Sequence, residues 1–233
     1  MLIYILTFIL GAVIASFLNV LAKSVPIHQN WWFRKSACPH CQKVLGPLQL
    51  IPILSFLIQK GRCRSCATNV SPLYVLAEVA GGLLFTSPLI FLPNPPVHLL
   101  QTWLFFSLLL TVTLTDLCYG LIPNKILITF GIPLLFFQPN IATAIIGFLF
   151  FYGAFFLGKL LFKKETIGFG DMKLYLVIGL VFQVQSLLVS IAIASVAALL
   201  YILLFAKNNK SAPIPFAPFI AIGTIIAYIL AMR

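Results

Sequence analysis

The chain has 233 residues, of which 61% are hydrophobic and 8% are charged, whereas about 25% of the residues of an average globular protein are charged. A soluble fold of this size needs a charged surface, so the composition excludes most soluble proteins and predicts an integral membrane protein. The net charge of +11 arises from 15 Lys and Arg against four acids. Because the basic residues lie between apolar segments, they indicate orientation in a membrane, and we expect no nucleic-acid partner.

The first candidate span covers residues 2–22, and about 20 apolar residues suffice to cross a bilayer. A polar region follows at residues 23–72, with seven basic residues and no acid. This asymmetry places the polar region in the cytoplasm and the N-terminus outside. Within it, residues 48–58 are apolar but too few for a span. We expect them to lie in the membrane interface or to pack within the loop.

Three long apolar stretches follow, and each is about the right length for two crossings. They cover residues 73–115, 126–162 and 174–206, with breaks near residues 93–96, 138–140 and 183–185. A last apolar stretch covers residues 216–232. We therefore expect an all-α polytopic membrane protein with about eight transmembrane helices and both termini outside. The expected domains are a first helix at residues 1–22, a cytoplasmic insert at residues 23–72 and a helical membrane core at residues 73–233.

Four of the five cysteines lie in the insert, in two C-x-x-C units. The members are Cys38 and Cys41 in the first unit, and Cys63 and Cys66 in the second. Paired units of this kind resemble zinc knuckles, in which two tight turns supply four thiolates in a tetrahedron. The alternative is a pair of disulfides, which a reducing cytoplasmic location disfavours. We expect a structural zinc site that helps to fold the insert and performs no hydrolysis.

The four acids need individual explanations in so apolar a chain. Asp116 and Asp171 are expected at a similar depth near the cytoplasmic face, although they are far apart in sequence. If folding brings them together, two carboxylates that cannot both ionise easily would share a proton and activate water as acid and base. The alternative is that both are interfacial, with Asp171 paired to Lys173 or Lys164 or stabilised by the dipole of its helix.

The other two acids receive different interpretations. Glu78 is expected about 8 Å inside the second span, where an acid is costly and therefore a candidate functional residue. The alternative is that Glu78 is a hydrogen-bonded residue holding helices together. Glu165 lies beside Lys163 and Lys164, which is typical of a solvated surface charge.

These features, in this order, resemble the type IV prepilin peptidases, which are aspartic membrane peptidases of the G-x-G-D type and are also called prepilin leader peptidase/N-methyltransferases. The resemblance covers most of the chain. Its motifs are, in chain order, Gly11 with Ser16-Phe17-Leu18-Asn19-Val20, the two cysteine units with Lys60-Gly61-Arg62 before the second, Glu78, Asp116 with Ile122-Pro123, Gly168-Phe169-Gly170-Asp171-Met172-Lys173, and Pro215-Phe216-Ala217-Pro218-Phe219.

The resemblance implies an endopeptidase of the bacterial cytoplasmic membrane, with its active site facing the cytoplasm. It would remove the basic leader from type IV prepilins or pseudopilins, with Asp116 and Asp171 as the catalytic pair. The family commonly then methylates the new N-terminus with S-adenosylmethionine, and the zinc insert and the early acid, here Glu78, have been tied to that step. The implied partners are prepilin or pseudopilin substrates and membrane lipids.

Departures from the family pattern affect neither aspartate. The family often has an acid where this chain has Asn124, and a glycine where it has Ala217. No dinucleotide-type glycine motif supports the methyl donor.

The sequence is also compatible with two other classes of function. A proton-coupled transporter would use the intramembrane acids as a relay. A non-catalytic assembly factor would depend on its zinc insert and tolerate loss of Asp116.

Overall fold

The computed structural model describes residues 1–27, 29, 36–38, 40–91, 95–137, 139–162, 168–205 and 214–231. Within these residues the regular structure is helical, apart from two isolated β-bridges in the insert. The chain divides into two compact units, residues 1–90 and 91–233, and each is described by itself. The expectation of an all-α protein is confirmed for the described residues.

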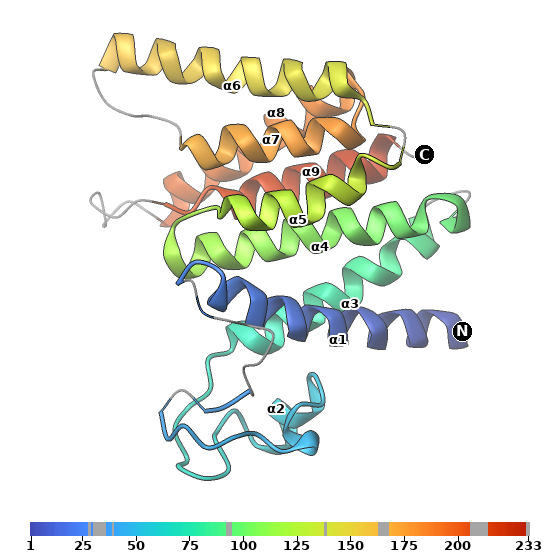
Figure 1. Ribbon diagram of the computed structural model, residues 1–233, viewed down its shortest axis with the longest axis vertical. Coiled ribbons are helices and arrows are strands. Elements are labelled where there is room, and N and C mark those ends of the chain that lie inside the picture. Colours follow the sequence, from blue (N-terminus) through green and yellow to red (C-terminus); the bar gives the residue numbers. More distant parts are fainter. Residues whose placement is uncertain are drawn as a thin grey trace. The chain divides into compact units, whose positions relative to one another are not determined.

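The first unit contains two long helices, α1 (Leu2–Ser24) and α3 (Leu73–Phe91). Between them lies the insert, with the 3-10 turn η1 (Pro47–Gln49) and the short helix α2 (Leu54–Ile58) (Figure 1). Glycine permits a close approach of the long helices, because a Cβ on Gly81 would lie only 2.8 Å from the carbonyl oxygen of Gly11. Small residues at such contacts are the usual means by which membrane helices associate.

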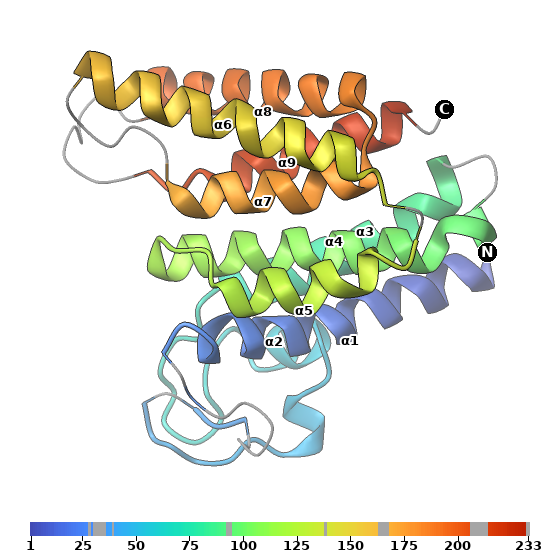
Figure 2. The same cartoon turned by 45° about the horizontal axis from the view of Figure 1, so that its top comes forward.

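The second unit consists of the helices α4 to α9 in the described residues. Their bounds are Pro95–Tyr119 for α4, Asn124–Leu134 for α5, Ile141–Phe162 for α6, Phe169–Val181 for α7, Val184–Phe205 for α8 and Ala217–Ala231 for α9. Helix α8 packs against α9, and α6 packs against α7. Helix α4 contacts both α5 and α9, and α5 lies beside α4 in both ribbon views (Figures 1 and 2).

The core of the second unit is aromatic. The hydroxyl of Tyr228 on α9 lies 2.6 Å from that of Thr102 on α4, and both side chains are buried. The Tyr228 ring also contacts Phe105, Phe106 and Phe182, with ring centroids 5.6 to 6.1 Å apart. A phenolic ring suits this position because its apolar body fills the core while its hydroxyl finds a partner. This cluster holds α4 against α9, two helices that also carry parts of the candidate site.

Among the described residues, five helices are long and apolar enough to cross a membrane, so the protein is a multi-pass membrane protein. They are α1, α3, residues Leu99–Tyr119 of α4, residues Ile141–Leu160 of α6, and α8. Helices α5 and α7 have 11 and 13 residues, which at about 1.5 Å per residue span less than the roughly 30 Å of a bilayer core. Each of the three long apolar stretches nevertheless contains two helices, as the sequence predicts.

Candidate active site and metal centre

Asp116 lies in the last turn of α4. The helix ends at Tyr119, because Gly120 adopts a left-handed conformation (φ +64°) and donates its N–H to the carbonyl oxygen of Asp116 at 2.8 Å. Glycine at this place is a common way to terminate a helix. The Asp116 side chain is buried, and its Oδ2 accepts a hydrogen bond from the backbone N–H of Ala217 at 2.8 Å. The start of α9 therefore holds this carboxyl in position.

Asp171 lies in the first turn of α7, three residues after the N-cap Gly168. Its carboxylate folds back over that residue, since a Cβ on Gly168 would lie 3.3 Å from Asp171 Oδ2. A Cβ on Gly170 would lie 3.0 Å from Cβ of Ile122, so glycine lets the loop after α4 approach the start of α7. The two glycines thus make room for the acid and for the neighbouring loop.

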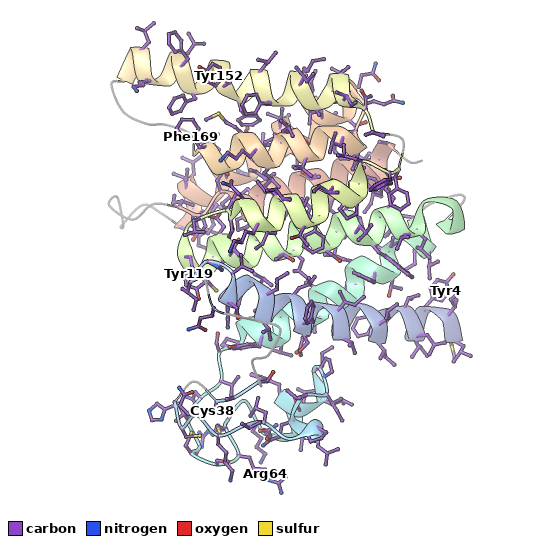
Figure 3. The ribbon with its side chains drawn as sticks, in the orientation of Figure 1. Tyr4, Cys38, Arg64, Tyr119, Tyr152 and Phe169 are labelled. Carbon is purple, nitrogen blue, oxygen red and sulfur yellow. The ribbon has the colours of Figure 1, made fainter. Side chains whose placement is uncertain are left out.

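The structure brings the two aspartates close enough to interact electrostatically, although 54 sequence positions separate them. Tyr119 follows Asp116 by three residues and Phe169 precedes Asp171 by two, and both labelled side chains lie at the same end of the helices (Figure 3). Helices α4, α7 and α9 each supply a part of this cluster. Two carboxyls that influence each other electrostatically, one of them fixed by a backbone donor, are candidates for an acid and base pair.

Lys173 does not form an ion pair with Asp171 in the described part of the chain. Its ammonium group donates a hydrogen bond to Oδ1 of Asn124 at 3.0 Å. Asn124 begins α5 and Lys173 lies in α7, so the bond joins the two helix starts beside Asp171. The alternative of a structural pair between Asp171 and Lys173 is therefore wrong, whereas Lys164 and Glu165 lie outside the described residues.

The four predicted cysteine ligands lie on two turns with the same construction. Each C-x-x-C unit is closed by an isolated β-bridge, Ala37 with Val44 in the first and Arg62 with Asn69 in the second. The backbone N–H groups of Cys38 and Cys63 donate to the carbonyl oxygens of Lys43 and Thr68, respectively, at 3.0 and 2.9 Å. In both turns the residue after the second cysteine has a positive φ, 57° at Gln42 and 56° at Ala67.

The sulfur atoms of the four cysteines lie within 4.8 Å of one another, and the sulfurs of Cys38 and Cys66 are 3.8 Å apart. A tetrahedral zinc site with Zn–S bonds of about 2.3 Å has sulfur–sulfur edges of about 3.8 Å. The donor set and its spacing therefore fit a metal. Cys38, labelled in Figure 3, and Cys63 are buried, as expected for ligands of a closed structural site.

Hydrogen bonding lowers the pKa of two of these thiols, whereas that of Cys41 is raised to about 11. The side-chain hydroxyl and backbone N–H of Thr68 lower the pKa of Cys66 to about 6. The backbone N–H groups of Cys41 and His40 also lower the pKa of Cys38. A metal binds the thiolate, so a lowered pKa favours the form that coordinates it.

Glu78 lies in the second turn of α3 and is buried. Its Oε2 accepts a hydrogen bond from the backbone N–H of Ile53 in the insert, at 2.7 Å. Its other carboxylate oxygen accepts no hydrogen bond from the described residues. Glu78 thus holds the insert to α3, a contact that the sequence alone does not predict.

Comparison with known families matches both units of the chain. Residues 9–91 match the bacterial peptidase A24 N-terminal domain, and residues 103–203 match the type IV leader peptidase family. A protein of Bacillus subtilis (strain 168) named prepilin leader peptidase/N-methyltransferase is 37% identical over 95% of this chain and 92% of its own length. The chain belongs to the type IV leader peptidase family. It is a peptidase, and the resemblance seen in the sequence is confirmed.

More distant members of the type IV leader peptidase family carry the same name. The relatives from Pectobacterium carotovorum and Aeromonas hydrophila are 28% and 29% identical over 95% of this chain, and 91% and 89% of their own lengths are covered. No solved structure matches the chain.

Two parts of the candidate site of this leader peptidase were not predicted as functional. Ala217 appeared only as a departure from the family motif, yet its backbone N–H binds Asp116. An alanine provides this donor as well as a glycine does. Asn124 appeared as a second departure, yet it accepts the hydrogen bond of Lys173. Both lie in motifs that the sequence marks, but the donor of one is a backbone group that no residue pattern reveals.

Proposed function

We propose that this chain is a membrane aspartic endopeptidase in which Asp116 and Asp171 are the catalytic residues. The observation that carries the proposal is the approach of the loop after α4 to the start of α7, where a Cβ on Gly170 would lie 3.0 Å from Cβ of Ile122. This approach brings the Asp116 and Asp171 carboxyls close enough to interact electrostatically. The ionised aspartate would take a proton from water, and the protonated one would donate to the carbonyl oxygen of the scissile bond. The N–H of Ala217 would keep Asp116 oriented throughout.

We further propose that the substrates are type IV prepilins or pseudopilins and that the enzyme removes their basic leader at the cytoplasmic face. The family and the names of the relatives support this substrate class. The basic, acid-free residues 23–72 support a cytoplasmic location for the insert, and Asp116 lies near the end of its helix. Family membership favours a peptidase over a proton-coupled transporter.

The arrangement in the membrane is part of the proposal. Eight crossings would arise from α1 and α3 to α9, with the shorter helices α5, α7 and α9 completing the five long ones. Both termini would then lie outside the bacterial cytoplasmic membrane. The three domains would be the first helix at residues 1–22, the insert at residues 23–72 and the membrane core at residues 73–233.

The insert would bind a structural zinc ion through Cys38, Cys41, Cys63 and Cys66. Four thiolates would complete the coordination shell, so zinc would stabilise the insert and take no part in hydrolysis. The sulfur–sulfur distance of 3.8 Å supports this metal.

Methylation of the new N-terminus is the second activity we propose. S-adenosylmethionine would supply the methyl group, and the unoccupied carboxylate oxygen of Glu78 would interact with the positive charge of that donor. The names of the relatives support this step.

The proposal is tested by incubating the purified full-length chain with a prepilin that carries a basic leader. Mass spectrometry should show a product that starts just before the apolar helix, and with S-adenosylmethionine the product should gain one methyl group. If several prepilins and pseudopilins remain intact with an enzyme that is folded, the substrate assignment is wrong. Cleavage without methylation would contradict only the second activity.

A further inference from the structure

The insert exposes several large apolar side chains within one short segment. Six large residues between positions 48 and 58 have exposed fractions of 41% to 79%; they are Leu48, Leu50, Ile51, Leu54, Leu57 and Ile58. We call this set the apolar patch. Soluble surfaces rarely expose so many large apolar residues together, and such patches mark sites of interaction with protein or membrane.

The patch is attached to a membrane helix at a defined depth. Ile53, directly before α2, donates its N–H to Glu78 Oε2 at 2.7 Å. Glu78 lies five residues beyond Leu73, the first residue of α3, or about 8 Å along a helix that rises about 1.5 Å per residue. Helix α2 therefore begins beside the first two turns of α3, which is a candidate membrane span.

The backbone at this attachment is strained. Ile53 has φ 63° and ψ −54°, and Leu54 donates its N–H to the carbonyl oxygen of Pro52 at 2.6 Å, which together form a γ-turn. A positive φ is an outlier for a β-branched residue, and this turn is rare. Strained backbone persists only where its surroundings hold it. The carboxylate of Glu78 supplies that support by accepting the N–H of Ile53.

Basic residues flank the patch on the same insert. Lys43, Lys60, Arg62 and Arg64 are exposed, and residues 23–72 contain no acid. A segment with exposed apolar side chains and neighbouring bases binds the boundary of an anionic bilayer, where the apolar part enters the interface and the bases meet the headgroups. The uniform positive charge disfavours a basic peptide as the partner.

We propose that the apolar patch is a membrane-surface anchor that seats the insert on the anionic leaflet of the bilayer, with Glu78 as the residue that positions it. The anchor goes beyond the proposed function, because it requires neither zinc, nor methyl transfer, nor a particular substrate. Residues 48–58 would then lie in the membrane interface, which is one of the two positions expected from the sequence, and would not pack within the loop.

The test is photo-cross-linking of the full-length protein in nanodiscs of phosphatidylglycerol and phosphatidylcholine, with radiolabelled lipid as the readout. In the test variant, the photoreactive residue p-benzoylphenylalanine replaces Leu57, which is exposed. In the matched control it replaces Phe56. The Phe56 ring faces into the insert, since a Cβ on Gly61 would lie 3.0 Å from it. We expect lipid cross-linking at position 57 to exceed that at position 56 several-fold.

Each other outcome contradicts a defined part of the proposal. Cross-linking of position 57 only to protein, within the chain or to a second copy, would overturn the anchor. An equal yield in nanodiscs of phosphatidylcholine alone would overturn the assignment to an anionic surface. Glu78→Leu should lower the lipid yield several-fold while Glu78→Gln, which keeps an acceptor oxygen, should retain it. Equal yields of lipid cross-linking in both variants would show that Glu78 does not position the anchor.

Discussion

A backbone N–H of α9 holds Asp116 in place, whereas Asp171 folds over the glycine at the start of its own helix. The two carboxyls are therefore fixed by different elements, and neither is neutralised by a basic side chain among the described residues. Two carboxyls without a neighbouring positive charge reduce the stability of the fold, but they are well suited to proton transfer. At the residue scale, the proposed chemistry depends on few and specific contacts.

The first prediction concerns the donor to Asp116. Ala217→Pro removes the N–H that binds Asp116 Oδ2, and loss of a hydrogen bond to a charged group costs about 1.5–3 kcal/mol. Proline suits the chain here because Ala217 is the first residue of its helix. We expect kcat for prepilin cleavage to fall about tenfold or more. Ala217→Gly keeps the N–H and should retain activity. A folded proline variant with unchanged kcat would contradict this role.

The second prediction concerns Cys66 in the metal-free protein. The hydrogen bonds from Thr68 lower its pKa to about 6, so its thiolate should form as the pH rises through 6, whereas an ordinary thiol ionises near about 8.5. Alkylation by iodoacetamide, followed by mass spectrometry of the Cys66 peptide, should therefore rise between about pH 5 and pH 7.

Two comparisons control this experiment. A free cysteine derivative in the same solution should react only at higher pH, and added zinc should protect Cys66 from alkylation. Thr68→Val removes the hydroxyl and should move the rise in alkylation to higher pH. If alkylation of Cys66 depended on pH in the same way as alkylation of the free cysteine derivative, the proposed role of Thr68 would be wrong.

At the scale of elements, helix pairs meet through small residues. In the first unit, Gly81 lies against Gly11 and Ala15 of the neighbouring helix. In the second unit, a Cβ on Gly179 of α7 would lie 2.8 Å from the carbonyl oxygen of Thr143 in α6. These contacts involve backbone atoms, which cannot move aside as a flexible side chain can. The hydrogen bond between Ile53 and Glu78 then fixes the insert to the first pair.

The third prediction is that Gly81→Ala destabilises the first unit. The added methyl group would meet Ala15 and the carbonyl oxygen of Gly11, which lies 2.8 Å from the Cβ position, so the helices must separate. Forced overpacking of this kind costs about 1–3 kcal/mol. We expect a lower midpoint of thermal unfolding in detergent. Gly153→Ala on α6 is the matched control, because its Cβ meets nothing within 4 Å, and an unchanged midpoint for Gly81→Ala would refute the close contact.

The helix pattern of the chain could be predicted from its sequence because strong breaks separate its apolar stretches. Helix α3 ends at Phe91 and α4 begins at Pro95, at the predicted break near residues 93–96, and α7 begins at Phe169, five residues before the apolar stretch predicted at residues 174–206. The two C-x-x-C units predicted the sulfur cluster for a similar reason, since each unit fixes two sulfurs on one tight turn.

The remaining contacts could not be predicted because the groups that make them have no residue signature. The donors to Asp116 and Glu78 are backbone N–H groups of Ala217 and Ile53. The second of these requires a positive φ at an isoleucine, which local preferences argue against. Lys173 donates to Asn124, which is far away in sequence, and not to Asp171 two residues before it; the packing of α5 against α7 brings Lys173 and Asn124 together.

At the scale of the whole molecule, the proposed site needs helices from distant parts of the chain. Asp116 comes from α4, Asp171 from α7 and the donor N–H from α9, all within the second unit. A substrate that is itself a membrane helix with a basic leader would meet these acids where its leader ends. The net charge of +11 repels such a leader in general, so local acids and anionic lipid would have to attract it.

If the two aspartates form one catalytic unit, replacing either one alone should abolish cleavage of a prepilin. The enzyme is co-expressed with a prepilin that carries a basic leader, and the size of the prepilin is read by gel for the wild type, Asp116→Asn and Asp171→Asn. Wild type should shorten the substrate, and each variant should lower cleavage by about 100-fold or more, the usual contribution of an acid or base. Cleavage at the wild-type rate by either variant, with equal amounts inserted in the membrane, would contradict the account.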